Sequence, residues 1–291
     1  MNILSFDIEE WYIEKKFHGG RVKKYKEFDS YLSKILDTLD ENKQKATFFC
    51  VGKIAINFPH VIKQISERGH EIGCHSNEHL WLTKMLPKQL RTDTKEAIAS
   101  LEDVSGQKVV SYRAPAFSIG EKNKWAIEIL AECGIERDSS IYPAIRDFGG
   151  LSSFPSNSPV IIEYNGIQLK EFPIRLAHIM GKDIAYSGGG YFRFFPLWFV
   201  KNKMHQSDYF IAYFHIGDLI HDQGGMMTRE EYEIYFRENG SLKNRIVRYT
   251  KSNLGTKGAF DKMRKLLNSS TFINLSEADR HIKSYNKVLL K

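Results

Sequence analysis

The sequence predicts an α/β protein built around a parallel sheet. Short apolar segments with strand character alternate with longer segments that place apolar residues on one helical face. Repeated strand–helix units of this length are the units that join neighbouring parallel strands. The chain has 291 residues, which is long enough for one α/β barrel. We therefore expect a parallel sheet that is either open or closed into a barrel.

The first half of the chain contains these units in order. Pro87 near the start of one predicted helix and Gly106 just past its end mark that helix clearly. Gly69 ends an earlier helix in the same way. The strands are short apolar runs, predicted at 2–8, 45–52, 70–75, 109–115 and 135–142. The helices between them are predicted at 28–43, 58–69, 87–106 and 121–134.

The second half departs from this alternation. The segment 160–174 alternates in strand fashion around Asn165-Gly166, which is a strong hairpin turn signal. A buried strand at 209–219, a helix at 258–270 and a last strand at 271–275 follow. We expect a single domain over 1–291, with a core at about 1–220 and a C-terminal extension of helix and strand at about 221–291.

Composition excludes several classes of protein. The formal charge of +7 comes without any recognisable nucleic-acid-binding motif, so it indicates a basic solvated face rather than a nucleic-acid partner. Three cysteines without a CxxC spacing make a disulfide framework a poor fit. The start of the chain enters a strand at once, and no apolar run reaches the ~20 residues that span a bilayer. We expect a cytoplasmic protein without a transmembrane segment, compatible with work beside a membrane; its oligomeric state is not indicated.

Chemically active residues gather where predicted strands end. Acids follow the first strand at Asp7, Glu9 and Glu10, and the pair His75 and His79 follows the third. Functional groups collect at the carboxyl ends of strands in parallel α/β proteins. Two neutral imidazoles and one carboxylate make a three-ligand site for a divalent metal with open positions. The two histidines approach each other if the chain turns helical after the strand.

Three further residues complete a shared site. Arg113 ends the fourth strand, Asp138 lies on the next, and His215 lies on the late strand. Each alone is more often an ion-pair partner or a core histidine, but their co-occurrence at matching strand ends is hard to obtain from packing alone. One carboxylate can bind the metal while another takes a proton from water, and His215 can protonate the leaving group if an acid such as Asp138 orients it. Such a site would hydrolyse an amide or an ester.

The motifs, in order along the chain, resemble the polysaccharide deacetylase family of carbohydrate esterases. The segments that carry the resemblance are "LSFDIEEW", "ATFFCVG", "GHEIGCHSNEH", "YRAPAFS", "DSSIYP" and "AYFHIGDL". The resemblance implies a distorted (β/α)7-type barrel, here with a β-hairpin-rich insertion, and a divalent metal, usually Zn²⁺, with Co²⁺ or Ni²⁺ as alternatives. It also implies these roles: Asp7 as catalytic base, His75 and His79 as metal ligands, Arg113 as support of the base, His215 as general acid, and Asp138 as the acid that tunes it.

The first motif departs from the commonest form of the family, which has two adjacent aspartates. Here Asp7, Glu9 and Glu10 stand at i, i+2 and i+3. Residues i and i+2 of a strand share a face, and relatives with an Asp-x-Asp form use the second acid as ligand, so we assign Glu9 to the metal. Glu10 remains the fallback, and a weak or empty metal site remains open.

The resemblance implies removal of N-acetyl groups from an amino sugar of a surface polysaccharide or its precursor. The motif around Pro115 and the later "SGGGYFRFFP", with Tyr191 and Arg193, are candidate substrate-binding segments. The latter also resembles a subgroup associated with surface-glycan gene clusters. Two alternatives remain: an amidase or deformylase acting on a small non-glycan amide, and a catalytically inactive glycan-binding barrel.

Overall fold

The computed structural model describes residues 1–291 except 147, 180, 222–224 and 237. Its main sheet has the strand order β10-β1-β2-β3-β4-β5-β7-β6-β11. The strands of this sheet are β1 (Asn2–Ile8), β2 (Thr47–Cys50), β3 (Glu71–Cys74), β4 (Ser111–Tyr112), β5 (Arg137–Asp138), β6 (Val160–Tyr164), β7 (Ile167–Glu171), β10 (Phe210–His215) and β11 (Asn286–Leu289). A separate hairpin is formed by β8 (Leu176–Ile179) and β9 (Lys182–Ala185).

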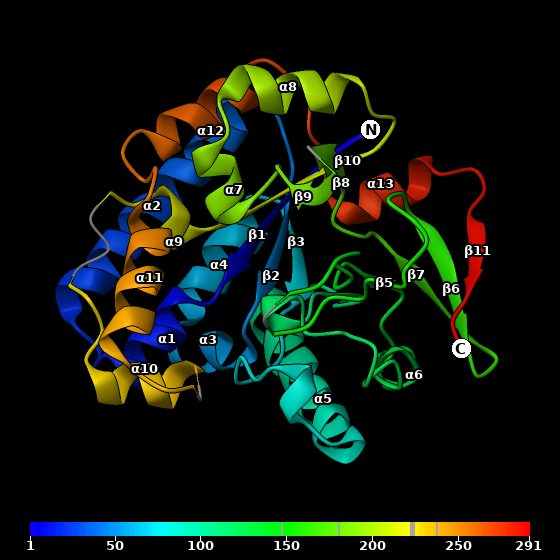
Figure 1. Ribbon diagram of the computed structural model, residues 1–291, viewed down its shortest axis with the longest axis horizontal. Helices are drawn as coiled ribbons and strands as arrows, with labels where there is room; N and C mark the ends of the chain where they lie inside the picture. Colours follow the sequence, from blue (N-terminus) through cyan, green and yellow to red (C-terminus); the bar gives the residue numbers. More distant parts are fainter. Residues whose placement is uncertain (147, 180, 222–224, 237) are drawn as a thin grey trace.

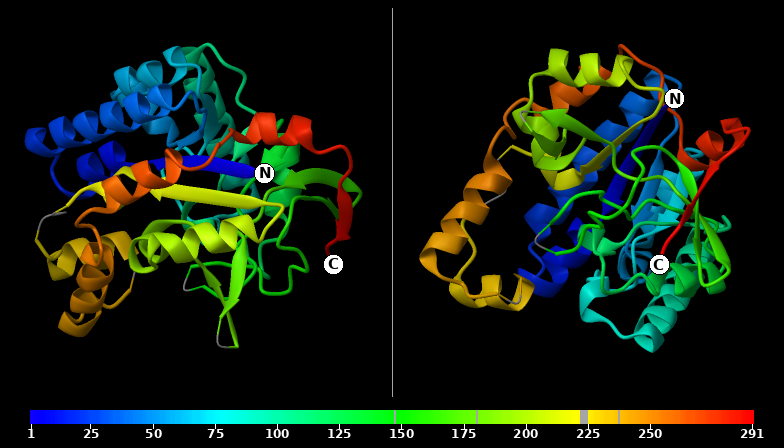
Figure 2. Two further views of the ribbon diagram at one scale, coloured as in Figure 1. Left: turned by 90° about the horizontal axis from the view of Figure 1, so that it is seen from above. Right: turned by 45° about the vertical axis from the view of Figure 1, so that its right-hand side comes forward.

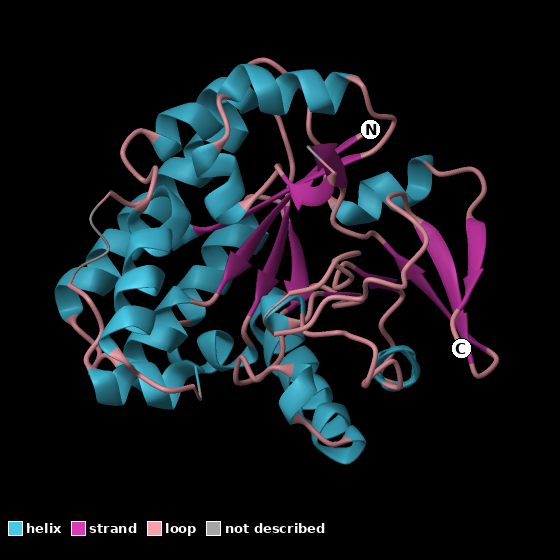
Figure 3. Ribbon diagram, viewed as in Figure 1, coloured by secondary structure: helices cyan, strands magenta, loops and turns pink. Residues whose placement is uncertain are grey.

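Parallel pairing dominates the sheet, as the alternation of strands and helices predicts. The seven strands from β10 to β7 pair in parallel, β6 is antiparallel to β7, and β11 is parallel to β6. Figure 3 shows these strands fanning out with helices around them. The α/β fold is therefore confirmed, although no pairing between β10 and β11 closes a barrel among the described strands.

Helices pack around the sheet, and the C-terminal part of the chain adds further helices (Figure 1). The helices of the first half are α1 (Glu10–Phe17), α2 (Val22–Glu41), α3 (Gly52–Asn57), α4 (Pro59–Glu67), α5 (Pro87–Ser105) and α6 (Ala126–Glu132), with short 3₁₀ turns η1 (Leu82–Lys84) and η2 (Pro115–Phe117). Those of the second half are α7 (Gly189–Phe194), α8 (Leu197–His205), α9 (Ile216–Leu219), α10 (Arg229–Phe236), α11 (Leu242–Asn253), α12 (Ala259–Leu267) and α13 (Leu275–His281). None of the described helices is long and apolar enough to span a membrane.

The local signals explain several of these boundaries. Gly106 ends α5 with φ 67°, and Asn165 and Gly166 join β6 to β7 with φ values of 50° and 80°. Both turns therefore use the left-handed backbone region that glycine and asparagine tolerate best. The hairpin prediction is confirmed.

The prediction of a last strand at 271–275 is wrong. In that segment Ile273 makes only one isolated bridge, to Ile3, and Leu275 already begins α13. The last strand is instead β11, which pairs with β6 because β6 would otherwise be an unpaired edge of the sheet.

The alternation of β1 places its side chains in two different environments. Leu4 and Phe6 belong to the large core under the helices, where Phe6 stacks on Phe48 with ring centroids 4.9 Å apart. Ile3 faces the other side of the sheet and belongs to a second, smaller apolar cluster. By the same period of two, Ser5 and Asp7 share the face of Ile3, so Asp7 is directed to the inner side of the sheet.

Candidate metal centre and active site

The pairing of β1 with β10 brings the acids that end β1 close to His215. β1 pairs in parallel with β10, and Asp7 is aligned with His215 at their carboxyl ends. Figure 2 shows β10, in yellow, running beside β1, in dark blue. Glu9 follows β1 directly, and His75 follows β3 at the same edge of the sheet. Segments that are 200 residues apart in sequence are thus brought together by strand pairing.

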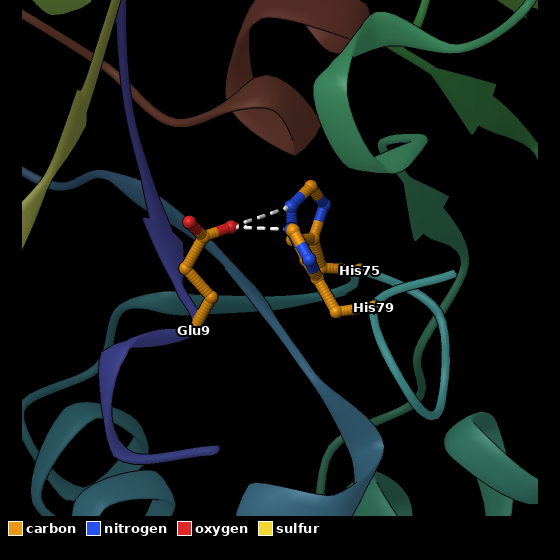
Figure 4. Close-up of side chains that lie close together, drawn as sticks. All are labelled: Glu9, His75 and His79. Carbon is orange, nitrogen blue, oxygen red and sulfur yellow. Dashed lines mark ion pairs between the residues drawn. The ribbon is translucent and has the colours of Figure 1, made fainter. Parts of the chain in front are cut away.

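Glu9, His75 and His79 form a cluster with the geometry of a metal site. Oε2 of Glu9 lies 2.6 Å from Nε2 of His79 and 3.4 Å from Nε2 of His75 (Figure 4). Their ligand atoms all lie within 4.8 Å of one another. Nε2 of each histidine is buried and makes no hydrogen bond within the described part of the chain. Two orphaned imidazole nitrogens that face one carboxylate oxygen fit a divalent cation such as Zn²⁺.

The orientation of His75 is fixed by the backbone. Its Nδ1 lies 2.7 Å from the carbonyl oxygen of Arg113. A carbonyl can only accept, so Nδ1 carries the proton and donates, which leaves the lone pair of Nε2 for a metal. A hydrogen bond of this kind both orients the ring and selects the tautomer that can bind a metal.

The loop after β3 is not helical, contrary to the expectation for the two histidines. Ser76 and His79 instead take left-handed backbone conformations, with φ values of 60° and 55°. Such conformations are costly for residues other than glycine and tend to persist at functional sites. They bend the loop back on itself, so that His79 reaches the same carboxylate as His75.

The charge of Glu9 is stabilised by its neighbours. Burial by itself raises the pKa of Glu9, but the nearby imidazoles of His79, His215 and His75 lower it well below its usual value. Glu9 is therefore an anion that is ready to bind a cation. Glu10 points elsewhere: its Oε1 accepts a hydrogen bond of 2.6 Å from the backbone N–H of Gly217. The cluster thus contains Glu9 and not the fallback Glu10.

Asp7 and Arg113 form a buried ion pair beside this cluster. Arg113 is fully buried, and its NH1 donates to Oδ1 of Asp7 at 2.8 Å and to Ser5 Oγ at 2.9 Å. Its remaining donors reach the carbonyl and hydroxyl oxygens of Ser139. The guanidinium also lies over the ring of Phe49, 4.2 Å from its centroid. Arg113 is therefore held on all sides and fixes one oxygen of Asp7, leaving the other directed at the site.

His215 faces both acids. Its Nε2 lies 3.8 Å from Oδ2 of Asp7 and 3.7 Å from Oε1 of Glu9. Its Nδ1 lies 3.0 Å from Oδ2 of Asp218. Burial lowers the pKa of His215, but the charges of Glu9, Asp218 and Asp7 outweigh it and raise the pKa well above its usual value. His215 is thus a charged proton donor directed at the site.

The acid that orients His215 is Asp218, and the predicted role of Asp138 is wrong. Asp138 is fully buried at the end of β5, where it bonds Ser140 and faces Glu171. Strands β1 to β4 separate β5 from β10, which is why Asp138 does not take the place beside His215. The signal that would have identified Asp218 is its spacing: it lies three residues after His215, within the turn that begins α9.

Asp138 instead belongs to a buried pair of carboxyl groups. Burial, offset in part by hydrogen bonds, raises the pKa of Asp138 to about 6, and burial together with the charge of Asp138 raises the pKa of Glu171 well above its usual value. The raised pKa of Glu171 favours its protonated form, which is the form that can donate to Asp138. Oε1 of Glu171 also accepts from the backbone N–H of Ile141 at 2.9 Å, and Ser140 donates to Asp138 while accepting from the N–H of Ala114. The pair joins β5 and β7 to the loop that follows Arg113.

The predicted substrate-binding residues lie in different surroundings. Pro115 is buried at the start of η2, and Tyr191 is 40% exposed on α7. Arg193 lines a cavity of about 610 Å³ together with Glu9 and His215. However, its guanidinium is bound to the carbonyl oxygens of Lys251 and Ser252 and lies 3.6 Å from Asp218, so its donors are directed at the protein.

Two cavities meet at the candidate metal centre. The first, of about 620 Å³, contains His79, Trp81 and Tyr235, and the second contains Glu9, His215 and, again, Tyr235. Burial and the nearby carboxylates of Glu9 and Glu10 raise the pKa of Tyr235, so its phenol stays protonated. Sequence reasoning missed Tyr235, because nothing in the pattern of α10 distinguishes it from a packing residue.

Comparison with known protein families agrees with this geometry. Residues 21–137 match the polysaccharide deacetylase family. This match covers less than half of the chain, and over these residues the chain is similar to that family. Residues 139–279 match a second family, described only as a domain of unknown function, DUF3473.

Several of the similar proteins are named as deacetylases. A peptidoglycan N-acetylglucosamine deacetylase of Bacillus cereus is 35% identical over 99 residues, which is 34% of this chain and 36% of the relative. A peptidoglycan N-acetylmuramic acid deacetylase of Bacillus subtilis is 30% identical over 107 residues, 34% of this chain and 41% of the relative. The alignments thus span less than half of either relative. A solved structure of a candidate polysaccharide deacetylase from Mycobacterium smegmatis covers 100% of this chain and 93% of its own, with a TM-score of 0.63 at 17% identity, and so supports the fold.

Residues of the candidate site come from both matched regions. His75, His79 and Arg113 lie in the first, whereas His215 and Asp218 lie in the second. Asp7 and Glu9 precede both. The region of unknown function therefore supplies the imidazole that faces both acids, together with the residue that orients it.

Proposed function

We propose that this protein is a metal-dependent hydrolase that removes N-acetyl groups from an amino sugar of a surface polysaccharide or its precursor. The observation that carries the proposal is the cluster of Glu9, His75 and His79 placed directly beside Asp7 and His215. The match of residues 21–137 to the polysaccharide deacetylase family and the similarity to peptidoglycan deacetylases support the same reaction class. Zn²⁺ is the proposed metal, with Co²⁺ or Ni²⁺ as alternatives, and a cytoplasmic location stays a prediction.

The chemistry divides among the chain's own residues. Glu9, His75 and His79 would hold a divalent metal, which when bound would supply Lewis acidity toward the acetyl carbonyl and toward water. Asp7, held by Arg113 through one oxygen, accepts a proton from water through the other.

His215 has the complementary task. Its Nδ1 is bonded to Asp218 and its Nε2 faces the site, so Nε2 donates a proton to the amine that leaves. Asp218 stabilises the charged imidazole before that transfer. The products are acetate and a free amino sugar.

The test measures acetate release and metal content on the same preparations. A chelator is expected to abolish acetate release from N-acetylated oligosaccharides, and Zn²⁺ to restore it. Asp7→Asn should lose turnover while keeping the metal, whereas His79→Ala should lose both. Glu9→Gln should lower metal content, and Glu10→Gln should leave it within about twofold, because only Glu9 lies against the histidines. A metal-free protein in which Asp7 and His215 are dispensable would falsify the proposal.

The same assay separates the alternatives. A small non-glycan amide turned over far faster than any acetylated oligosaccharide would indicate an amidase or deformylase. Glycan binding that survives Asp7→Asn, with no acetate released by any metal form, would indicate a binding module.

A further inference from the structure

The C-terminal helices α10 and α11 form one wall of the cavity that contains Glu9 and His215. In Figure 1 they are coloured yellow to orange at the lower left, where α10 packs against α1 and α11 packs against α10. Tyr235 of α10 and Arg245 and Arg248 of α11 line this cavity of about 610 Å³. A substrate that reaches the candidate metal centre through this cavity must pass these side chains.

Arg248 is held in place without the use of its hydrogen-bond donors. Its guanidinium lies over the ring of Phe236 at 4.4 Å and over that of Phe148 at 5.3 Å. Stacking of this kind fixes the plane of the group and leaves the N–H edge open. Within the described part of the chain, the side chain of Arg248 makes no hydrogen bond and no ion pair.

The other arginines of the cavity are committed to protein groups. Arg21 is bound to Glu14 by two hydrogen bonds of 2.8 Å. Arg245 donates to the carbonyl oxygens of Gly240 and Met227. Arg193 is bound to two carbonyl groups, as described above. Among the arginines that line this cavity in the described part of the chain, Arg248 is thus the one whose charge and N–H donors remain available to a ligand.

The rings under Arg248 continue into the neighbouring cavity. Phe148 lies between Phe236 and Trp81, with centroid distances of 6.2 Å and 4.1 Å and interplanar angles of 20° and 29°. Trp81 lines the first cavity together with His79. A row of nearly parallel rings therefore leads from the first cavity to the guanidinium of Arg248. Rings can pack against the apolar faces of sugars, and a half-buried guanidinium binds carboxylate or phosphate oxygens in pairs.

We propose that Arg248 binds an anionic substituent, a carboxylate or a phosphate, of the glycan that occupies this cavity. The inference rests on the proposed function and narrows its substrate class to acidic N-acetylated glycans. A neutral chain would leave the charge of Arg248 unmatched at the end of the aromatic row. A uronate or a sugar phosphate would satisfy it with charge-assisted hydrogen bonds.

Binding to the full-length protein, with and without Zn²⁺, tests the inference by titration calorimetry. The probes are a hyaluronan tetrasaccharide, which carries carboxylates, UDP-N-acetylglucosamine, which carries phosphates, and neutral chitotetraose. At least one anionic probe should bind about tenfold more tightly than chitotetraose, because hydrogen bonds to charged groups are the strong ones. The preference should shrink as salt is added. The anionic probe that binds identifies the source of the charge.

Three variants locate the effect. Arg248→Gln should reduce the preference for the anionic probe to within about twofold, and Arg248→Lys should retain part of it, because the charge remains while the planar fork is lost. Lys243→Gln is the matched control: it removes the same charge from an exposed position on α11 that does not line the cavity. Circular dichroism confirms that each variant is folded.

The outcomes separate this inference from the proposed function. Equal binding of all three probes, no binding of any, or an unchanged preference in Arg248→Gln would overturn the role of Arg248, whatever the acetate assay shows. Preferential binding that depends on Arg248 supports it, even if no acetate is released. That combination would refute the proposed deacetylation but support the binding of an anionic group by Arg248.

Discussion

The hydrogen bond between His215 and Asp218 makes the sharpest prediction about catalysis. Asp218→Asn keeps the shape of the side chain and its ability to accept from the backbone N–H of His215, which Oδ2 does at 3.0 Å. It removes the negative charge that lies 3.0 Å from Nδ1 of His215. Hydrogen bonds to charged groups are worth about 1.5–3 kcal/mol, and about 1.4 kcal/mol corresponds to tenfold in rate. We expect kcat to fall about ten- to hundredfold, with little change in KM.

The pH profile gives a second readout of the same change. Asp218 is one of the groups that raise the pKa of His215, so its removal lowers that pKa. The general acid then loses its proton at lower pH, and the alkaline fall of kcat should begin earlier than in the wild type. Acetate release measured across pH with the metal-loaded protein tests both effects.

Asp138→Asn is the comparison that decides between the two acids. It removes a carboxylate whose contacts lie around Ser140 and Glu171, so the alkaline limb of the pH profile should stay in place. The reasoning is wrong if Asp218→Asn retains wild-type kcat and pH profile while Asp138→Asn, folded and metal-loaded, loses them.

Two further predictions concern stability. The pKa of Asp138 is raised to about 6, and that of Glu171 is also raised, so the folded chain holds protons that the unfolded chain releases at lower pH. The free energy of unfolding therefore falls as the pH rises from about 4 through the pKa values of the folded state. Glu171→Gln keeps a neutral donor toward Asp138, and its thermal midpoint should therefore fall less than that of the wild type between pH ~5 and ~8; parallel curves would contradict this. Gly188→Ala would place a Cβ 2.3 Å from the ring of Tyr213 and 2.4 Å from its carbonyl oxygen. We expect a loss of about 1–3 kcal/mol in urea unfolding, and an unchanged midpoint would refute the close packing.

Local signals were sufficient for most of the parallel sheet. The apolar strand runs, Pro87, Gly106 and the Asn165-Gly166 turn each act within a few residues, and the structure contains the elements they predict. The grouping of Glu9 with His75 and His79 was also accessible, because the period of two along a strand separates Glu9 from Glu10.

Features that depend on distant partners were not accessible. Asp138 and Asp218 are both acids near strand ends, and only the strand order shows which of them reaches His215. β11 forms at 286–289 because β6 offers an edge there, whereas the more apolar 271–275 has only the single bridge of Ile273. The role proposed for Arg248 could not be predicted from the sequence either, because it depends on the rings of Phe148 and Phe236, which other segments supply.

The pairing of β1 with β10 has a consequence for how the protein can be divided. On one side β1 is bonded to β2, but its other edge is covered only when residues 210–215 arrive. A fragment that ends at 137 would hold the candidate metal ligands yet expose that edge and the apolar side chains beside it. Exposed apolar edges recruit other chains, so such a fragment should aggregate rather than persist as a smaller enzyme. The same edge of β1 is unpaired during synthesis, because β10 is made about 200 residues after β1.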